Sequence, residues 1–190
     1  MNLRDRRTET EWQLLQTLAE ANPATFSAVT RSQDEFHIVM RDSPAWVKGK
    51  MRPLIETEHA LRYVYHHYYP TLPLEGYFLR PILHVNVDPV TGFACLWQDY
   101  RTTQTIVDAV LITRAIMSCK VANWDPAHRM QQDAVVQLPE SCILCMPSLT
   151  IPANCRTMMP YRSSGRKRIS TSAVEDQLPR EDAFAFSDTE

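Results

Sequence analysis

The sequence HVNVDPVTGFACLW, residues 84–97, contains one histidine, one asparagine and one cysteine around a short turn. The turn at residues 88–92 contains aspartate, proline and glycine, which favour such a bend. An apolar run typical of a strand precedes this stretch at residues 77–83, and a run typical of a helix follows at residues 105–118. The pattern therefore places a thiol and a side-chain amide on either side of a short loop, between a sheet and a helix.

Cys95 alone fits two interpretations. Free cysteines are among the most buried residue types, so an inert core thiol is the ordinary expectation for such a residue. A thiol is also the side chain best suited to act as a nucleophile at neutral pH. The choice between them depends on the segments that surround this one.

The chain has 190 residues, 44% hydrophobic and 22% charged, with a formal net charge of −2. These values suit one globular domain with tails and give no general reason to expect a nucleic-acid or membrane partner. No run of roughly 18 apolar residues occurs, and the first seven residues lack the apolar core of a secretory signal. We therefore expect a cytoplasmic protein without a membrane span.

Five cysteines without a secretory signal indicate reduced thiols, not a disulfide framework. Cys142 and Cys145 have the spacing of a zinc knuckle, but a structural zinc needs four ligands, and only Cys155 or distant histidines could complete the set. We expect no metal and no organic cofactor. Cys119 is expected in the core.

The periodicity predicts an N-terminal helix at residues 3–21, with Trp12, Leu15 and Leu18 on the apolar face and Glu11 mostly elsewhere. Local pairing of successive strands favours an α+β fold with a four-stranded antiparallel meander over a doubly wound sheet. An irregular crossing that carries Cys95 then leads to one long central helix. The expected strands are residues 25–30, 36–40, 59–68 and 77–83; residues 42–53 are expected to be a loop, residues 105–118 the long helix and residues 129–136 a short helix.

Prolines recur from residue 139 onward and no periodicity persists there. We therefore divide the chain into a domain at residues 1–138 and a proline-rich, largely disordered tail at residues 139–190. A basic run at residues 162–168 is interpreted as part of this solvated tail, although it could also bind an acidic partner.

Several separated pieces, in order, resemble the ubiquitin-conjugating enzymes. Residues 84–86 are similar to that family's His-Pro-Asn motif, with Val85 in place of proline, and residues 92–96 are similar to its Gly-x-x-Cys-Leu motif. The resemblance spans residues 3–136 and implies a UBC-like fold. The departures, including a short segment between Cys95 and residue 105, indicate a divergent branch, with a prokaryotic-type member as one option. The other matching pieces are Tyr69-Pro70-x-x-Pro73, Thr105-Ile106 and Asn123-Trp124-Asp125-Pro126.

The resemblance implies a carrier enzyme. Cys95 would accept a ubiquitin-like modifier protein from an activating enzyme as a thioester and pass it to an amine, with or without a ligase. Asn86 would stabilise the oxyanion, Asp125 would orient the incoming lysine, and His84 would support the loop. Each role has a structural alternative: a turn for Asn86, an Asp-Pro turn for Asp125. The residues expected to bind the partner, some of which could equally be core, are Tyr69, Pro70, Trp97 and Tyr100.

Two other functions stay open. A non-catalytic adaptor of the same fold would bind a ubiquitin-like protein without carrying it, and such variants usually lack the cysteine. A cysteine hydrolase would need a base beside Cys95, for which His84 is the only nearby candidate in the sequence.

Overall fold

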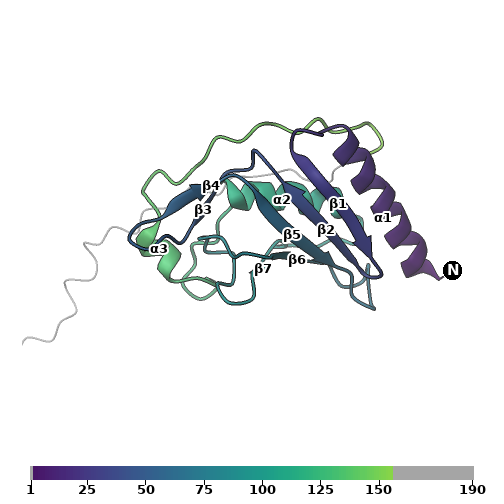
Figure 1. Ribbon diagram of the computed structural model, residues 1–190. Helices are drawn as coiled ribbons and strands as arrows, with labels where there is room; N and C mark the ends of the chain where they lie inside the picture. The colour runs from purple at the N-terminus through teal and green to yellow at the C-terminus, as the bar shows by residue number, and fades with distance from the viewer. Residues whose placement is uncertain (1, 156–190) are drawn as a thin grey trace, which may run out of the picture.

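The computed structural model describes residues 2–155, in which an N-terminal helix is followed by an antiparallel sheet and a long central helix (Figure 1). The helices are α1 (Leu3–Glu20), α2 (Ile106–Met117) and α3 (Asp133–Gln137). The strands are β1 (Phe26–Ser32), β2 (Glu35–Met40), β3 (Ala45–Val47), β4 (Leu54–Glu56), β5 (His59–Val64), β6 (Glu75–Phe78) and β7 (Phe93–Ala94).

The main sheet has the order β1-β2-β5-β6-β7, so each strand pairs with the next strand of the sheet along the chain. Alternate residues of β2 and β5 are buried, with Phe36 paired to Tyr63 and Ile38 paired to Leu61. This period of two is what a sheet covered on one face requires. The α+β fold with an antiparallel meander is confirmed, and the two-residue β7 adds a strand to the predicted four.

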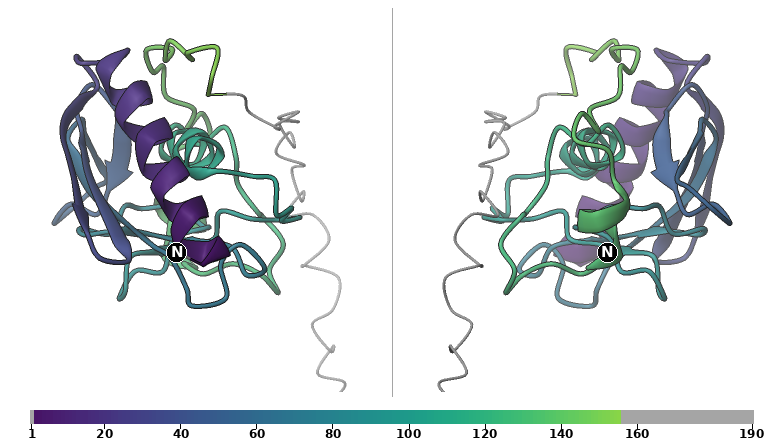
Figure 2. Two further views of the ribbon diagram at one scale, coloured as in Figure 1. Left: turned by 90° about the vertical axis from the view of Figure 1, so that its right-hand side faces the viewer. Right: turned by 90° about the vertical axis from the view of Figure 1, so that its left-hand side faces the viewer.

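Helices α1 and α2 lie on the same face of the curved sheet, and α2 is seen end-on in Figure 2. The hydroxyl of Thr105 accepts a hydrogen bond from the Val107 amide, and the Asp108 carboxylate accepts one from the Thr105 amide at 2.8 Å. This capping box fixes the start of α2. Because almost every side of α2 is buried, its apolar stripe is wider than that of a surface helix.

The largest difference from the sequence prediction concerns residues 42–53. The expected loop at residues 42–53 contains β3, which forms a two-stranded hairpin with β4. The hairpin is held by contacts distant in sequence: the Trp46 indole donates to the Cys142 carbonyl at 2.9 Å, and the Leu83 amide donates to the Trp46 carbonyl at 2.7 Å. The strand predicted at residues 77–83 is also shifted, since β6 ends at Phe78, before Pro81.

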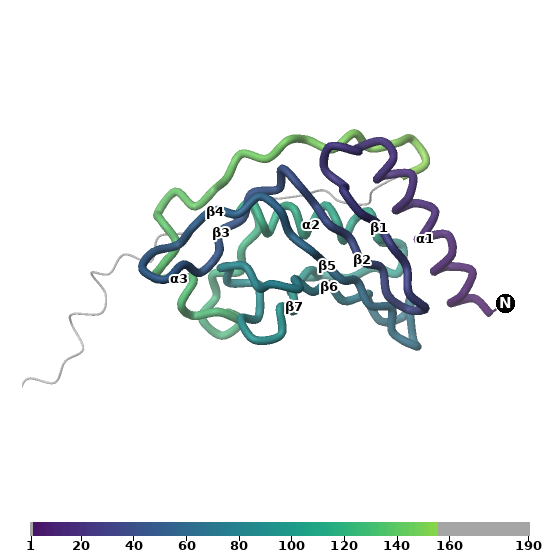
Figure 3. Tube along the Cα trace, viewed as in Figure 1, coloured from purple at the N-terminus to yellow at the C-terminus, as the bar shows by residue number. Residues whose placement is uncertain are grey.

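Residues 139–155 have no helix or strand but pack across the domain as an extended strap, which Figure 3 shows running from α3 back to α1. Arg114 donates to the Pro147 carbonyl, and the Asn22 side chain both donates to and accepts from the Thr150 backbone at 2.8 and 2.7 Å. This part of the predicted tail is therefore fastened to the domain. The predicted boundary at residue 138 stays a prediction, and the basic run at residues 162–168 lies outside the described residues.

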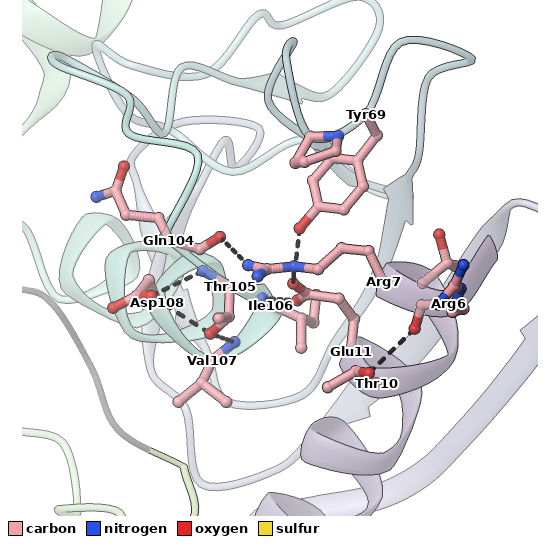
Figure 4. A network of polar contacts seen from close by, with 12 residues as sticks. Arg6, Arg7, Thr10, Glu11, Tyr69, Gln104, Thr105, Ile106, Val107 and Asp108 are labelled. Atoms are coloured by element: carbon pink, nitrogen blue, oxygen red, sulfur yellow. Dashed lines mark hydrogen bonds and ion pairs between the residues drawn. The ribbon is translucent and has the colours of Figure 1, made fainter. Parts of the chain in front are cut away.

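A buried carboxylate joins three parts of the fold (Figure 4). Glu11, fully buried on α1, accepts hydrogen bonds from the Tyr69 hydroxyl at 2.7 Å, from Arg7 Nε at 2.7 Å and from the Ile106 backbone amide. Burial raises the pKa of Glu11 although these donors act in the opposite direction. Arg7 also donates to the Gln104 carbonyl at 3.0 Å. Glu11 therefore connects α1 to the turn after β5 and to the start of α2.

Among residues 2–155, no helix is both long enough and apolar enough to cross a bilayer.

We predict that Glu11→Ala destabilises the fold strongly. The substitution leaves Arg7 and two buried donors without their acceptor, and breaking a buried pair in this way costs about 3–5 kcal/mol. Glu9→Ala is the matched control, because Glu9 also pairs with an arginine, Arg31, but at the surface, where such a pair contributes about 0–1 kcal/mol. Urea unfolding of both variants measures the difference. Equal losses of stability in the two variants would show that Glu11 is not the connection described here.

Candidate functional site

Cys95 follows β7 directly and is exposed at the surface. Its backbone amide donates to the Asn86 carbonyl at 2.8 Å, and an isolated bridge joins Val87 to Ala94. The two halves of the 84–97 stretch therefore lie side by side, as the turn between them predicted. Gly92 in that turn has a φ of +74°, and a Cβ there would approach the Phe78 carbonyl oxygen to 2.0 Å. Only glycine fits at this position.

Asn86 is buried, and its carboxamide contacts two separate segments. Its Oδ1 accepts from the Asn123 amide at 2.7 Å, and its Nδ2 lies 3.4 Å from the Cys95 carbonyl oxygen. The side chain therefore bridges the backbone of the cysteine segment and the loop that follows α2. A turn residue would bond only to its own backbone neighbours, whereas Asn86 contacts segments 9 and 37 residues away.

His84 is buried beneath this arrangement. Its Nδ1 accepts from the Asn86 amide at 3.1 Å, and its own backbone amide donates to Gln131 Oε1 at 2.8 Å. Burial lowers the pKa of His84 to about 3, so the ring is neutral at physiological pH. Because the ring contacts the backbone of the motif, it suits the loop-supporting role. This contact gives no support to the cysteine-hydrolase alternative, in which His84 would be the base for Cys95.

Asp125 lies on the exposed loop after α2. Its Oδ1 accepts from the Ala127 amide at 3.0 Å and its Oδ2 lies 2.8 Å from His128 Nδ1. These contacts, the Ala127 amide first, lower the pKa of Asp125. The residue therefore forms the predicted turn and also keeps an exposed carboxylate. His128 was not among the residues predicted from the sequence, where its only signal was the Asp-x-x-His spacing.

Although Cys95 is exposed as a residue, partial burial of its thiol raises the thiol pKa. Reactive cysteines of hydrolases have lowered pKa values because a base or a cation stabilises the thiolate. Cys95 is therefore exposed, and its surroundings do not lower the pKa of its thiol.

The predicted binding residues form a separate cluster. Tyr69 is buried and donates to Glu11, whereas Pro70, Trp97 and Tyr100 are half-buried. The Tyr100 hydroxyl donates to the Pro70 carbonyl at 2.8 Å, and the centres of the Trp97 and Tyr100 rings are 5.4 Å apart. These contacts brace the crossing between β7 and α2. A binding role stays a prediction, and for Tyr69 the described contacts are all internal.

Within the part of the chain that the structure describes, no three or more histidine, cysteine, aspartate or glutamate side chains gather to share a metal ion. Cys119 and Cys142 are buried in one small hydrophobic cluster, so Cys119 is a core residue as predicted, whereas Cys145 is exposed.

Comparison with known proteins identifies the fold. No protein-family model matches the chain, and no curated protein matches its sequence. A solved structure does match: the H. polymorpha ubiquitin conjugating enzyme Pex4p, in complex with the soluble domain of Pex22p, superposes with a TM-score of 0.53 and 15% identity. The match covers 71% of this chain and 87% of that one. The chain therefore has the fold of the ubiquitin-conjugating enzymes, in a form that is widely diverged in sequence.

Proposed function

We propose that this chain is a carrier that accepts a ubiquitin-like protein as a thioester on Cys95 and transfers it to an amine. The observation that carries the proposal is the exposed Cys95 at the end of β7, with the buried Asn86 carboxamide bridging its backbone to the loop of Asp125. The proposed partners are the modifier, its activating enzyme and, for some acceptors, a ligase. No cofactor is needed for the transfer.

Loading is an exchange of one thioester for another. The Cys95 thiolate attacks the activated carbonyl, the sulfur of the donor leaves, and a new thioester forms with little change in free energy. A thiol with a raised pKa supplies less thiolate but a more nucleophilic one. Such a thiol suits an exchange in which the donor is already activated.

Transfer requires that an amine attack the thioester carbonyl carbon. Negative charge then develops on the carbonyl oxygen, and a fixed amide donor nearby stabilises it. Asn86 Nδ2 is the candidate donor, since its partner Asn123 holds the other end of the carboxamide in place. The exposed Asp125 carboxylate would hold the incoming ammonium group near the thioester.

The adaptor function is the second candidate. The raised pKa of Cys95 favours it, since a thiol of low reactivity is compatible with binding alone. Thioester formation at Cys95 distinguishes a carrier from an adaptor.

We predict that Cys95→Ala abolishes adduct formation. Ubiquitin prepared as a thioester of 2-mercaptoethanesulfonate serves as the donor, and a non-reducing gel detects a thiol-sensitive adduct. The matched control is Cys145→Ala, which removes the other exposed cysteine and should keep the adduct. An adduct that persists in Cys95→Ala, or that depends on Cys145, would contradict the proposal.

We also predict the pH dependence of Cys95 alkylation by iodoacetamide. Because burial raises the pKa of the thiol, the thiolate forms at higher pH than in N-acetylcysteine, and the midpoint of the rate shifts upward. Peptide mass spectrometry follows the rate at Cys95 alone. A thiol that resists alkylation at every pH would favour the adaptor, and a midpoint below that of N-acetylcysteine would contradict the described surroundings.

Asn86→Asp tests the oxyanion role. Aspartate keeps an oxygen that can accept from the Asn123 amide but loses the side-chain donor. We expect discharge of the thioester to free lysine to slow by about 10²–10³-fold, the usual effect of removing such a donor, when the rate is measured well below the melting temperature of the variant. A variant that discharges at the wild-type rate would show that the carboxamide acts only in holding the loops together.

A further inference from the structure

His128 and Asp125 form an exposed histidine–carboxylate pair in which Asp125 Oδ2 lies 2.8 Å from His128 Nδ1. The side chains are 68% and 52% exposed, so both are open to an arriving molecule. A carboxylate at Nδ1 favours the neutral tautomer that carries its proton on Nδ1. In that tautomer Nε2 keeps its lone pair and can accept a proton.

The loop that carries this pair is attached at both ends to the His84-Val85-Asn86 motif. At one end the Asn123 amide donates to Asn86 Oδ1 at 2.7 Å, and at the other the Met130 amide donates to the Val85 carbonyl at 2.9 Å. The loop is therefore held in place by the same residues that hold the cysteine segment.

A continuous series of contacts leads from the cysteine to the histidine. Asn86 contacts the Cys95 carbonyl with Nδ2 and the Asn123 amide with Oδ1. The Asn123 side chain accepts from the Asp125 amide at 3.1 Å, and Asp125 then contacts His128. The pair is thus positioned relative to the thiol by hydrogen bonds, although these residues are far apart in sequence.

The charged groups beside the ring are Asp125 and Arg129. Asp125 supplies the negative charge at Nδ1. The nearby guanidinium of Arg129 is directed to a backbone oxygen, because its Nε and Nη2 donate to the Trp124 carbonyl at 2.8 and 2.6 Å. Arg129 therefore does not take the place of His128 on the carboxylate.

We propose that His128, oriented by Asp125, is the proton acceptor for the amine that attacks the Cys95 thioester. This inference rests on the proposed carrier function. Nε2 takes one proton from the ammonium group, and the freed lone pair forms the C–N bond. The C–S bond then breaks, the electron pair leaves with the Cys95 sulfur, and the second proton of the amine neutralises that thiolate. The products are an amide, a protonated His128 and a free thiol.

The test compares two nucleophiles on the same loaded protein. Wild-type and His128→Gln chains are loaded at Cys95 with ubiquitin from its mercaptoethanesulfonate thioester, separated from the donor and mixed with free lysine or with hydroxylamine at neutral pH. Lysine must lose a proton before it attacks, whereas hydroxylamine is largely unprotonated. We expect His128→Gln to slow discharge to lysine by about 10²-fold, the lower end of general-base effects, and to leave discharge to hydroxylamine unchanged.

The matched control is His37→Gln. His37 is also paired with a carboxylate, since its Nε2 lies 3.2 Å from Glu35 Oε2, but it is on β2. We expect this variant to behave as the wild type with both nucleophiles, and Asp125→Asn to lose rate with lysine.

Three outcomes would overturn the inference. Equal slowing with both nucleophiles would mean that His128 only supports the loop, and an unchanged rate with lysine would mean that it has no part in transfer. Either result leaves the carrier function standing, because loading at Cys95 is measured first. Failure of the wild type to load would overturn the carrier function and this inference together.

Discussion

The fold depends on the burial of one carboxylate, Glu11, at the junction of α1, the turn after β5 and the start of α2. A buried charge is costly unless donors surround it, and here a phenol, a guanidinium and a backbone amide do so. The amide belongs to the N-terminus of α2, where the helix dipole also favours negative charge. This one group therefore sets the position of the N-terminal helix against the helix that ends beside the candidate site.

The candidate site is held by hydrogen bonds of both its backbone and its side chains. The motif at residues 84–86 accepts or donates main-chain hydrogen bonds with Cys95, Met130 and the Gln131 side chain. Val85, where the conjugating-enzyme motif has proline, is fully buried in a small cluster with Leu83, so apolar packing fixes the segment. The Asn86 carboxamide thus lies 3.4 Å from the Cys95 carbonyl oxygen although residue 85 is not proline.

The sequence predicted the elements whose signals are local and missed those that depend on distant contacts. The 3.6-residue period found α1 and α2, alternation found β5, and the polar turn at residues 31–35 found β1 and β2. The hairpin of β3 and β4 was missed because prolines and a glycine suggest a loop, while Trp46 is secured by Cys142, 96 residues away.

Single side chains whose roles depend on distant contacts were missed for the same reason. Glu11 was expected on the polar side of α1, since helical periodicity does not reveal a second helix packed against that side. His128 belongs to no family motif and was marked only by its spacing from Asp125, whereas Cys95, Asn86 and Asp125 each lie in a motif.

The strap of residues 139–155 has a consequence for the order in which the chain folds during synthesis. Thr150 bonds to Asn22, and Cys155 lies against the Leu14 carbonyl of α1. A nascent chain cannot complete this closure until Cys155 has left the ribosome, so α1 stays partly uncovered until residues 139–155 have been synthesised.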